Sequence, residues 1–411
     1  MRIVITGVGI VAPNGIGKEE FWDNCFAGVS GVGPITLFDT CRYRCHSAGE
    51  VRSFTPEDHL GSKGLRTLDR TTRLALVAAK LALEDAQYEV TPANGKDVGV
   101  VLGSTMGSLH SISQFDMVGL RDGPRYVNPA LFPNVVINSP ASQVSIRFKL
   151  RGLSSTISTG FTAGLDAIGY ALHLLQLGRV KAMVVGGVEE LCLQTFLGFY
   201  RLGLLAAQEN GSPSGDALPP ARRRGTLLGE GAAVFVLEPL EEARRRNIRA
   251  YAELLGYSTA FHPDSMHRYD PSAAAAVKAL RQVLHDTELR PEAIDYVGAC
   301  ASSTRAIDAM ERTAITHVFG AHPSHLSVSA VKSMLGESFS AAAALQLAVA
   351  VGAIVRQQVP PTVHWEAGDA EIKLHVVPHQ ARSTRVETAL VPSISLTGIS
   401  SALVVRGHGD A

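Results

Sequence analysis

Hydrophobic positions along the chain follow two alternating patterns, short continuous apolar runs and longer stretches with helical spacing. Apolar runs at Met1–Val11, Val98–Ser104 and Lys181–Gly187 predict buried β-strands. Between the first two of these runs, Thr71–Glu89 places most of its apolar residues on one face, which predicts an amphipathic helix. Strands that alternate with helices in this way predict an α/β sheet with helices on its faces.

The second part of the chain repeats this order of elements. Its predicted helices are Pro271–Leu284, Ile307–Val318 and Ser340–Val355, and its predicted strands are Ile294–Ala299, Leu326–Val331 and Ala402–Arg406. The last of these helices is rich in alanine, which suits close packing between two sheets. We therefore predict a layered α/β fold of two pseudo-duplicated halves, residues 1–250 and 251–411.

One predicted strand-to-helix turn, Ser158–Gly164, has the pattern of a turn that presents a nucleophile. A β-branched run leads into it, small residues form it, and the helix-like stretch 165–175 leaves it. Such turns present a nucleophile to the first N–H groups of a helix, where the helix dipole favours a thiolate or an oxyanion. The residue at the tip is Phe161, which has no nucleophilic, acid or base chemistry.

Composition and charge exclude several classes of function. The 411 residues include 38 basic and 38 acidic side chains, so nothing global favours nucleic acid or an anionic membrane as a partner. No run reaches the roughly 18 apolar residues of a membrane span. The five cysteines form an odd, sparse set without a signal peptide, which indicates a reduced, cytoplasmic protein. The segment Cys41–His46 lacks zinc-site spacing, and we expect neither a metal nor a cofactor.

Several short segments, each weak alone, occur in an order that resembles the β-ketoacyl synthases of the thiolase superfamily. These segments are Thr6–Gly9, Pro13–Gly15, Gln143–Phe148, Gly229–Ala232 and Lys332–Gly336. The resemblance covers nearly the whole chain. It implies a thiolase-like layered αβαβα fold whose turn carries a cysteine that accepts an acyl chain as a thioester, assisted by two histidines.

The positions at which the resemblance places these catalytic groups carry other residues in this chain. Phe161 stands at the cysteine position, Cys300 at the first histidine and Glu337 at the second, whereas the family lysine is retained as Lys332. Condensation needs a thiolate and nitrogen donors that polarise a carbonyl, and loss of one oxyanion donor alone costs on the order of 100–1,000-fold in rate. We therefore expect no catalytic residue at these positions.

This concerted loss resembles the chain length factor (ketosynthase-β) subunits of type II polyketide synthases. Those subunits pair with an active ketosynthase and shape the tunnel that measures the growing chain. The resemblance implies a heterodimer with an active ketosynthase, with an acyl carrier protein as a further partner. The usual residue of those subunits at the turn is glutamine, so Phe161 is a departure that leaves the pathway class open.

The resemblance also implies that the helix-like stretch Ser108–Leu120 lies near the subunit interface and lines the tunnel. We predict that Ile112, Phe115 and Asp116 gate chain length, with an ordinary interface helix as the equal alternative. The C-terminal glycine loop of the family is replaced by Ser395–Gly398. The full set of predicted tunnel residues is Ile112, Phe115, Asp116, Phe132, Phe161 and Leu396.

Several residues admit a second interpretation. Phe161 plugs the nucleophile pocket of the family, forms a wall of the partner's tunnel, or fills an ordinary core, and we favour the plug. For Lys332 we favour a structural role, in which Asp308, Glu311 or Glu337 provides the partner that a buried lysine needs. The basic run 222–224 is either a carrier-protein contact or a solvated loop, and the loop is favoured.

Two further functions compete with the chain length factor. One is an acyl-thioester-using acyltransferase or condensing enzyme with relocated chemistry at Cys300. Because no histidine lies near Cys300 in the sequence, the favoured interpretation of this thiol is a small buried hydrophobic residue. The other function is a homodimeric acyl-binding or scaffold protein.

Overall fold

A computed structural model provides the structure, which describes residues 1–206, 225–263, 270–320, 326–363 and 375–408. The strands of the first half are β1 (Ile3–Ala12), β2 (Gly15–Ile16), β3 (Val32–Pro34), β4 (Ser47–Gly49), β5 (Val98–Gly103), β6 (Ser154–Ile157), β7 (Ala182–Glu189) and β8 (Gly231–Pro239). The α-helices of this half are α1 (Lys18–Ala27), α2 (Pro56–Leu60), α3 (Arg70–Asp85), α4 (Leu109–Asp122), α5 (Ser139–Phe148), α6 (Ala163–Gln176), α7 (Leu193–Arg201) and α8 (Leu240–Arg245). Short 3-10 helices are η1 (Gly95–Asp97), η2 (Pro124–Tyr126), η3 (Pro129–Val135) and η4 (Gly160–Thr162).

The second half has the same kinds of element. Its strands are β9 (Ala252–Phe261), β10 (Tyr296–Gly298), β11 (Ser327–Ser329), β12 (Gln358–Val359), β13 (Arg382–Ser383), β14 (Thr388–Ile394) and β15 (Ile399–Gly407). Its helices are α9 (Ala274–Asp286), η6 (Pro291–Ala293), α10 (Arg305–Phe319), α11 (Lys332–Leu335) and α12 (Ser340–Arg356).

The order of the strands shows that the two halves are built alike. The main sheet runs β11-β10-β14-β15-β9-β1-β8-β7-β5-β6, and the halves meet where β1 pairs with β9 over three residue pairs. From this junction outward, the first half presents β1, β8, β7, β5 and β6, and the second half presents β9, β15, β14, β10 and β11. Numbered along the chain, these are in both halves the first, fifth, fourth, second and third of the five strands named. Strand β5 in the first half and strand β10 in the second are parallel to both of their neighbours, whereas the other pairings along this path are antiparallel. The predicted α/β fold of two pseudo-duplicated halves is confirmed.

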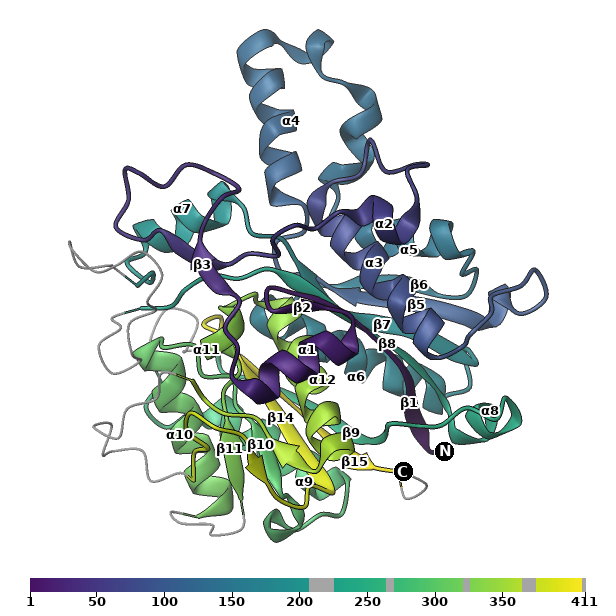
Figure 1. The fold of residues 1–411 in the computed structure, drawn as a ribbon, viewed down its shortest axis with the longest axis vertical. Helices are drawn as coiled ribbons and strands as arrows, with labels where there is room; N and C mark the ends of the chain where they lie inside the picture. Colours follow the sequence, from purple (N-terminus) through teal and green to yellow (C-terminus); the bar gives the residue numbers. More distant parts are fainter. Residues whose placement is uncertain (207–224, 264–269, 321–325, 364–374, 409–411) are drawn as a thin grey trace.

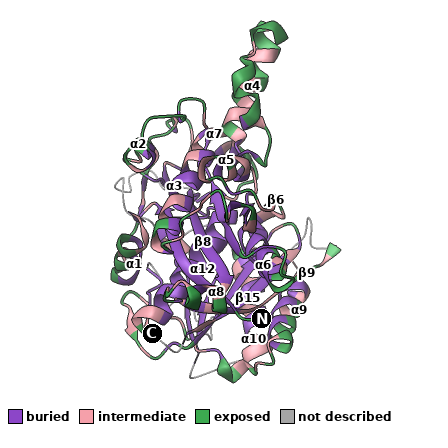
Figure 2. Cartoon of the chain, turned by 90° about the vertical axis from the view of Figure 1, so that its right-hand side faces the viewer, coloured by how far each residue is buried: buried purple, intermediate pink, exposed green. Residues whose placement is uncertain are grey.

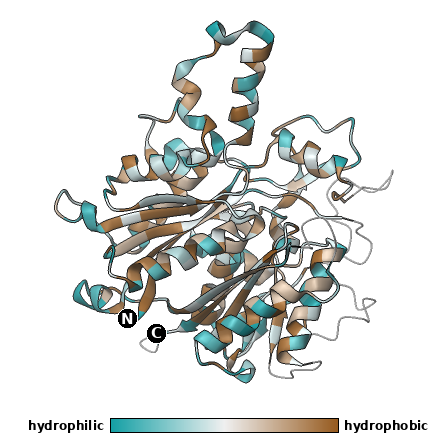
Figure 3. Cartoon of the chain, turned by 180° about the vertical axis from the view of Figure 1, so that it is seen from behind, coloured by the Kyte–Doolittle hydropathy of each residue, from teal (hydrophilic) through white to brown (hydrophobic). Residues whose placement is uncertain are grey.

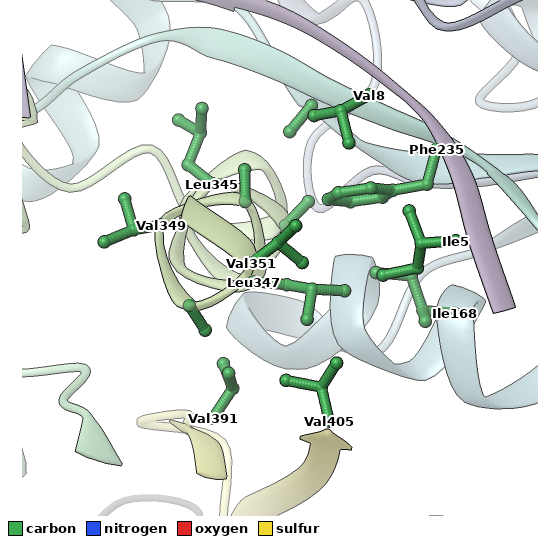
Figure 4. Packing of buried hydrophobic residues seen from close by; sticks show 14 of the residues in the cluster. Ile5, Val8, Ile168, Phe235, Leu345, Leu347, Val349, Val351, Val391 and Val405 are labelled. Atoms are coloured by element: carbon green, nitrogen blue, oxygen red, sulfur yellow. The ribbon is translucent and has the colours of Figure 1, made fainter. Parts of the chain in front are cut away.

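Helices α6 and α12 form the middle layer between the sheets of the two halves (Figure 1). Helix α3 covers the outer face of the first sheet, and α9 with α10 covers the outer face of the second. Side chains from both sheets converge on α12, where Phe235 and Val405 approach from opposite sides (Figure 4). The alanines of α12 are buried and small, which lets the helix pack closely on both sheets.

The continuous apolar runs arise because the central strands are covered on both faces. Along β7, Met183 and Val185 belong to the core around α6 and α12, whereas Ala182 and Val184 belong to the cluster under α3. Successive side chains of a strand point to opposite faces, so a doubly covered strand needs apolar residues at every position. Figure 3 shows the resulting contrast between apolar central strands and the hydrophilic surfaces of the outer helices.

One segment projects from this layered body. Helix α4 with η2 and η3, which we call the arm (residues 109–135), stands away from the sheets in Figures 1 and 2. No residue of α4 is buried, in contrast to the strands below it. No helix in the described ranges, α4 included, is long and apolar enough to cross a membrane.

The structure also corrects parts of the sequence-based assignment. Residues 128–140, which include three prolines, contain η3 and the start of α5. Pro140 lies in the first turn of α5, where its missing N–H breaks no helical hydrogen bond. Strand β9 was not predicted, because its half-buried positions include polar residues such as Glu253. Strand β14 extends to Ile394, so the loop Ser395–Gly398 follows it directly.

Candidate functional site

The strand-to-helix turn predicted around Phe161 is present. Strand β6 leads into η4, and η4 leads directly into α6. Gly160 has a φ of +77°, and a Cβ at this position would lie 2.9 Å from Ser395 Oγ, so the turn requires glycine. The backbone keeps a shape that presents one side chain, Phe161, at the tip of the elbow.

The Phe161 side chain does not face an open pocket but packs into an aromatic cluster. Its ring centroid lies 4.9 Å from that of Phe339 and 6.3 Å from that of Phe199, and the latter two rings are 5.1 Å apart. Phe199 comes from α7 and Phe339 immediately precedes α12, so three separate segments contribute one ring each. Phe161 is only 8% exposed, and the space at the tip of the elbow is filled.

A buried carboxylate holds the elbow to the second half of the molecule. Asp166 in the first turn of α6 accepts hydrogen bonds from the hydroxyls of Thr159, Thr162, Tyr257 and Ser401. The last two donors lie on β9 and β15, at 2.8 and 2.5 Å from Asp166 Oδ1. Four hydroxyl donors compensate for the burial of the carboxylate and fix the turn independently of any catalytic chemistry.

Glu337 forms a buried ion pair at the position where the family resemblance places a histidine. Lys332 Nζ lies 2.7 Å from Glu337 Oε2, and both side chains are nearly inaccessible. Burial lowers the pKa of Lys332, but the attraction of Glu337 and the neighbouring acidic groups outweighs it and holds this pKa above its ordinary value. Of the three partners considered for Lys332, Glu337 is the one within ion-pair distance.

The other oxygen of Glu337 holds the backbone beside the aromatic cluster. Glu337 Oε1 accepts a 2.8 Å hydrogen bond from the backbone N–H of Phe339. Phe339 has a φ of +52° and a ψ of −114°, a conformation that costs a non-glycine residue on the order of 1–3 kcal/mol. The aromatic contacts and the Glu337 hydrogen bond hold this strained residue in place.

Cys300 lies in surroundings that suppress thiol reactivity. The residue is 1% exposed, and burial, followed by the nearby Glu311 carboxylate, raises the pKa of its thiol well above the ordinary value. Glu311 Oε1 accepts the backbone N–H of Cys300 at 2.6 Å. Reactive cysteines are partly exposed and have a lowered pKa, so this thiol has the opposite properties.

Asp308, which is half-buried, completes the group of acids around Lys332. Its Oδ1 accepts the backbone N–H of Ser302 at 2.9 Å, and burial raises its pKa to about 7. Burial also raises the pKa of Glu311. Among the described residues, no group of three or more histidine, cysteine or acidic side chains is arranged to hold a metal ion. The positions at which the family resemblance places catalytic groups are therefore buried, and Lys332 and Glu337 are paired with each other.

Comparison with known proteins agrees with this architecture. Two family models match, "Beta-ketoacyl synthase, N-terminal domain" over residues 1–243 and "Beta-ketoacyl synthase, C-terminal domain" over residues 251–366. The chain belongs to the β-ketoacyl synthase family. Its predicted thiolase-like fold follows from this membership.

Some proteins similar to this β-ketoacyl synthase family member are named as synthases, and others as parts of polyketide ketosynthase complexes. It is 36% identical over 405 residues to 3-oxoacyl-(acyl-carrier-protein) synthase 2 of Coxiella burnetii, with 98% of both chains covered. A solved structure described as the ishigamide ketosynthase/chain length factor matches with a TM-score of 0.91 and 31% identity over 99% of both chains. Another, a type II PKS acyl-carrier protein in complex with its ketosynthase bound to the hexaketide, matches with a TM-score of 0.89 and 28% identity, again over 99% of both chains.

The predicted tunnel residues of this family member fall into two places. Phe115 and Phe132 meet on the arm, with ring centroids 6.0 Å apart, and Ile112 and Asp116 lie on the same helix. Phe161 and Leu396 instead belong to the buried cluster below, together with Met106 at the base of the arm. The gating role of these residues stays a prediction. The basic run 222–224 lies outside the described residues.

Sequence reasoning missed two groups of residues at this site. Phe199 and Phe339 are far from Phe161 in the sequence and meet it only in the folded chain. Glu189 and Glu190 follow the glycines of β7 and accept hydrogen bonds from the base of the arm. Two adjacent acidic residues directly after a buried strand were a visible signal, since buried carboxylates require partners.

Proposed function

We propose that this chain is a non-catalytic, chain-length-factor-like subunit that pairs with an active ketosynthase in a type II polyketide synthase and forms one wall of the acyl tunnel. The filled elbow is the observation that carries the proposal. Phe161 occupies the nucleophile position and is packed against Phe199 and Phe339, so neither an acyl thioester nor its nucleophile has room there.

The paired surroundings of the elbow support the same conclusion. A condensing enzyme needs donors that stabilise negative charge on a carbonyl oxygen. Glu337 instead brings a carboxylate to this position, and its charge is already paired with Lys332. The synthase activity named for the Coxiella relative requires chemistry that the residues at this elbow cannot supply.

The second supporting observation is an unpartnered apolar surface. Leu120 and Met117 on the arm are 83% and 55% exposed, and Ile146 on α5 is 70% exposed. Within the described residues β6 pairs with β5 alone, so its other edge is open. Open strand edges and large exposed apolar side chains favour association, and the ketosynthase/chain length factor neighbour indicates the kind of partner.

Relocated enzyme chemistry at Cys300 has little physical support. Deprotonation of this thiol is opposed by burial and by Glu311, and the residue is inaccessible to a carrier-bound substrate. We also propose an acyl carrier protein as a transient partner, as in the neighbouring complex, and a cytoplasmic location. All five cysteines are unpaired, which fits a reducing compartment.

Co-expression with a ketosynthase from the same gene cluster tests the proposal. We expect the two chains to co-purify as a heterodimer that condenses malonyl units, whereas this chain alone neither condenses them nor becomes acylated. A Phe161→Gln variant, which carries the usual residue of such subunits, should still pair and support condensation. Condensation by the isolated chain, or labelling of its Cys300 by an acyl thioester, would overturn the proposal.

A further inference from the structure

Two consecutive glutamates at the end of β7 hold the loop from which the arm begins. Glu189 accepts the backbone N–H of Thr105 through Oε2 at 2.7 Å and that of Met106 through Oε1 at 2.9 Å. Glu190 Oε1 accepts the backbone N–H of His110, in the first turn of α4, at 3.0 Å. Three N–H groups at the base of the arm are thus bound by side chains of a single strand end.

Glu190 acts as the N-terminal cap that α4 lacks in its own sequence. Ser108 occupies the cap position, but it makes no side-chain capping bond, and its buried Oγ has no hydrogen-bond partner among the described residues. The first turn of a helix leaves N–H groups unsatisfied and carries partial positive charge, so a carboxylate there is stabilising. Because the cap comes from β7, it fixes the helix to the sheet rather than to the preceding loop.

Glu189 connects the same loop to the elbow. Ser340 Oγ at the start of α12 donates to Glu189 Oε2 at 2.9 Å, and the backbone N–H of Ser340 donates to Thr105 Oγ1 at 3.2 Å. Thr105 Oγ1 in turn donates to the carbonyl oxygen of Gly160 in the elbow at 2.9 Å. Ser340 directly follows Phe339 of the aromatic cluster, so the base of the arm and the filled elbow share one hydrogen-bond network.

The carboxylates are kept in this network at a cost in solvation. Both are buried, and within the described residues neither has a lysine or arginine at ion-pair distance. Burial raises the pKa of each carboxyl to about 7. Buried acids without a cation depend on neutral donors, and here those donors are the backbone of the arm and the hydroxyls beside the elbow.

We propose that Glu189 and Glu190 are positioning residues that hold the arm in one orientation relative to the elbow and thereby set the length of chain that the paired complex makes. The inference rests on the proposed function, since length is expressed only in the complex. Helix α4 has no buried residue and meets the body along α7, and the far end of the arm is held by the buried Asn134, which donates to the carbonyl oxygen of Thr67. The hydrogen bonds from Glu189 and Glu190 are the contacts that fix the start of α4.

The test compares graded variants in the full chain. Glu190→Ala removes the cap, whereas Glu190→Gln keeps one oxygen for His110. Glu189→Gln keeps one acceptor oxygen and loses one of the two loop bonds. Glu50→Ala is the matched control, because Glu50 is also buried and accepts a backbone N–H at 2.7 Å, that of Thr36, in a loop remote in sequence from the arm.

Hydrogen exchange of the isolated chain and the products of the complex are measured for each variant. In Glu190→Ala and Glu189→Gln, amides 105–122 should exchange at least tenfold faster while those of β1 and β8 are unchanged. Their complexes should make a mixture of chain lengths at a total yield within a few-fold of wild type. Glu190→Gln should restore one length, and Glu50→Ala should leave the product length unchanged.

Equal acceleration of exchange in the arm and in the core would overturn the positioning role, because it indicates general destabilisation. A single, unchanged product length in complexes whose arm exchanges faster would overturn it as well. Failure of the wild-type chain to pair with a ketosynthase would instead refute the proposed function. The exchange experiment on the isolated chain still decides in that case whether the two glutamates fix the arm.

Discussion

The elbow and the arm differ in where their side chains find contacts: inside the same chain at the elbow, but largely in solvent on the arm. At the elbow, Phe161 packs against two other rings, and Glu337 neutralises Lys332 inside the protein. On the arm, helix α4 has no buried residue, and Leu120 is 83% exposed. The first region is complete within one chain, whereas the second presents apolar surface that a single chain leaves uncovered.

This difference separates a region that one chain completes from a region that it leaves uncovered. Among the described residues the buried Ser338 Oγ beside the elbow has no hydrogen-bond partner, but the rings are packed against one another and the charges are paired. The elbow therefore contributes stability and a rigid base. The chemistry that this chain influences is therefore expected at the surface it offers to a partner.

The largest expected effect comes from breaking the buried ion pair. Glu337→Ala leaves the Lys332 charge buried without a partner, and we expect the free energy of unfolding to fall by about 3–5 kcal/mol. Denaturant unfolding of the isolated chain measures this loss. The double variant Lys332→Met with Glu337→Met is the control and should lose less than Glu337→Ala, because it leaves no buried charge and loses only the hydrogen bond to the Phe339 N–H. A loss below about 1 kcal/mol in Glu337→Ala would show that water reaches the lysine.

The next effect tests whether Phe161 supports the core or only blocks a site. Phe161→Ala opens a cavity between Phe199 and Phe339, and we expect a loss of about 3 kcal/mol in the free energy of unfolding. Phe161→Leu should lose less, because it refills most of the volume. A neutral Phe161→Ala variant would mean that the ring is not part of the packed interior, which would weaken the contrast with the arm.

These two regions also differ in how far the sequence predicts them. The sequence alone shows which residues stand where the family resemblance places catalytic groups, because each position follows a motif with fixed spacing. These residues are Phe161, Cys300 and Glu337. The rings that surround Phe161 were not visible, since Phe199 and Phe339 approach it only through the packing of α7 and α12. Motif spacing places a residue on the backbone but does not specify its neighbours from other segments.

The same limit explains the outcome for the secondary structure. Strands covered on both faces, such as β5 and β7, were predicted because every position is apolar. Strand β9 was missed because one of its faces is only half buried, and its sequence mixes apolar residues with Glu253. The helix on the arm was predicted from its spacing, but the hydrogen bonds that its base receives from Glu189 and Glu190 were not, because these residues lie at the end of a strand far away in the sequence.

Stability should depend on pH through three acids whose desolvation outweighs the hydrogen bonds and charges that favour the ionised form. Burial raises the pKa of Glu189, Glu190 and Asp308 to about 7, so the folded chain binds protons more tightly than the unfolded chain. The free energy of unfolding should therefore fall as the pH rises from about 4 to about 7 and level off above, by on the order of 3 kcal/mol for each group, since the pKa of each carboxyl rises from about 4 in the unfolded chain to about 7 in the folded chain. Urea unfolding across this range measures the slope, which Asp308→Asn should reduce. A stability that rises over the same interval would contradict the assignment.

The smallest effect on folding is expected on the arm, where the largest effect on product is predicted. Phe115→Ala should change the free energy of unfolding of the isolated chain by no more than about 0.5 kcal/mol, because the helix is exposed. In the complex it should change the product length without abolishing condensation, as should Ile112→Ala. Leu120→Ala is the matched arm control and should weaken pairing while leaving the product length of the assembled complex unchanged. Mass spectrometry of the products separates the two effects. Unchanged length in both Phe115→Ala and Ile112→Ala would reject gating by the arm but not pairing, because an exposed apolar surface can recruit a partner without contacting the chain that grows inside it.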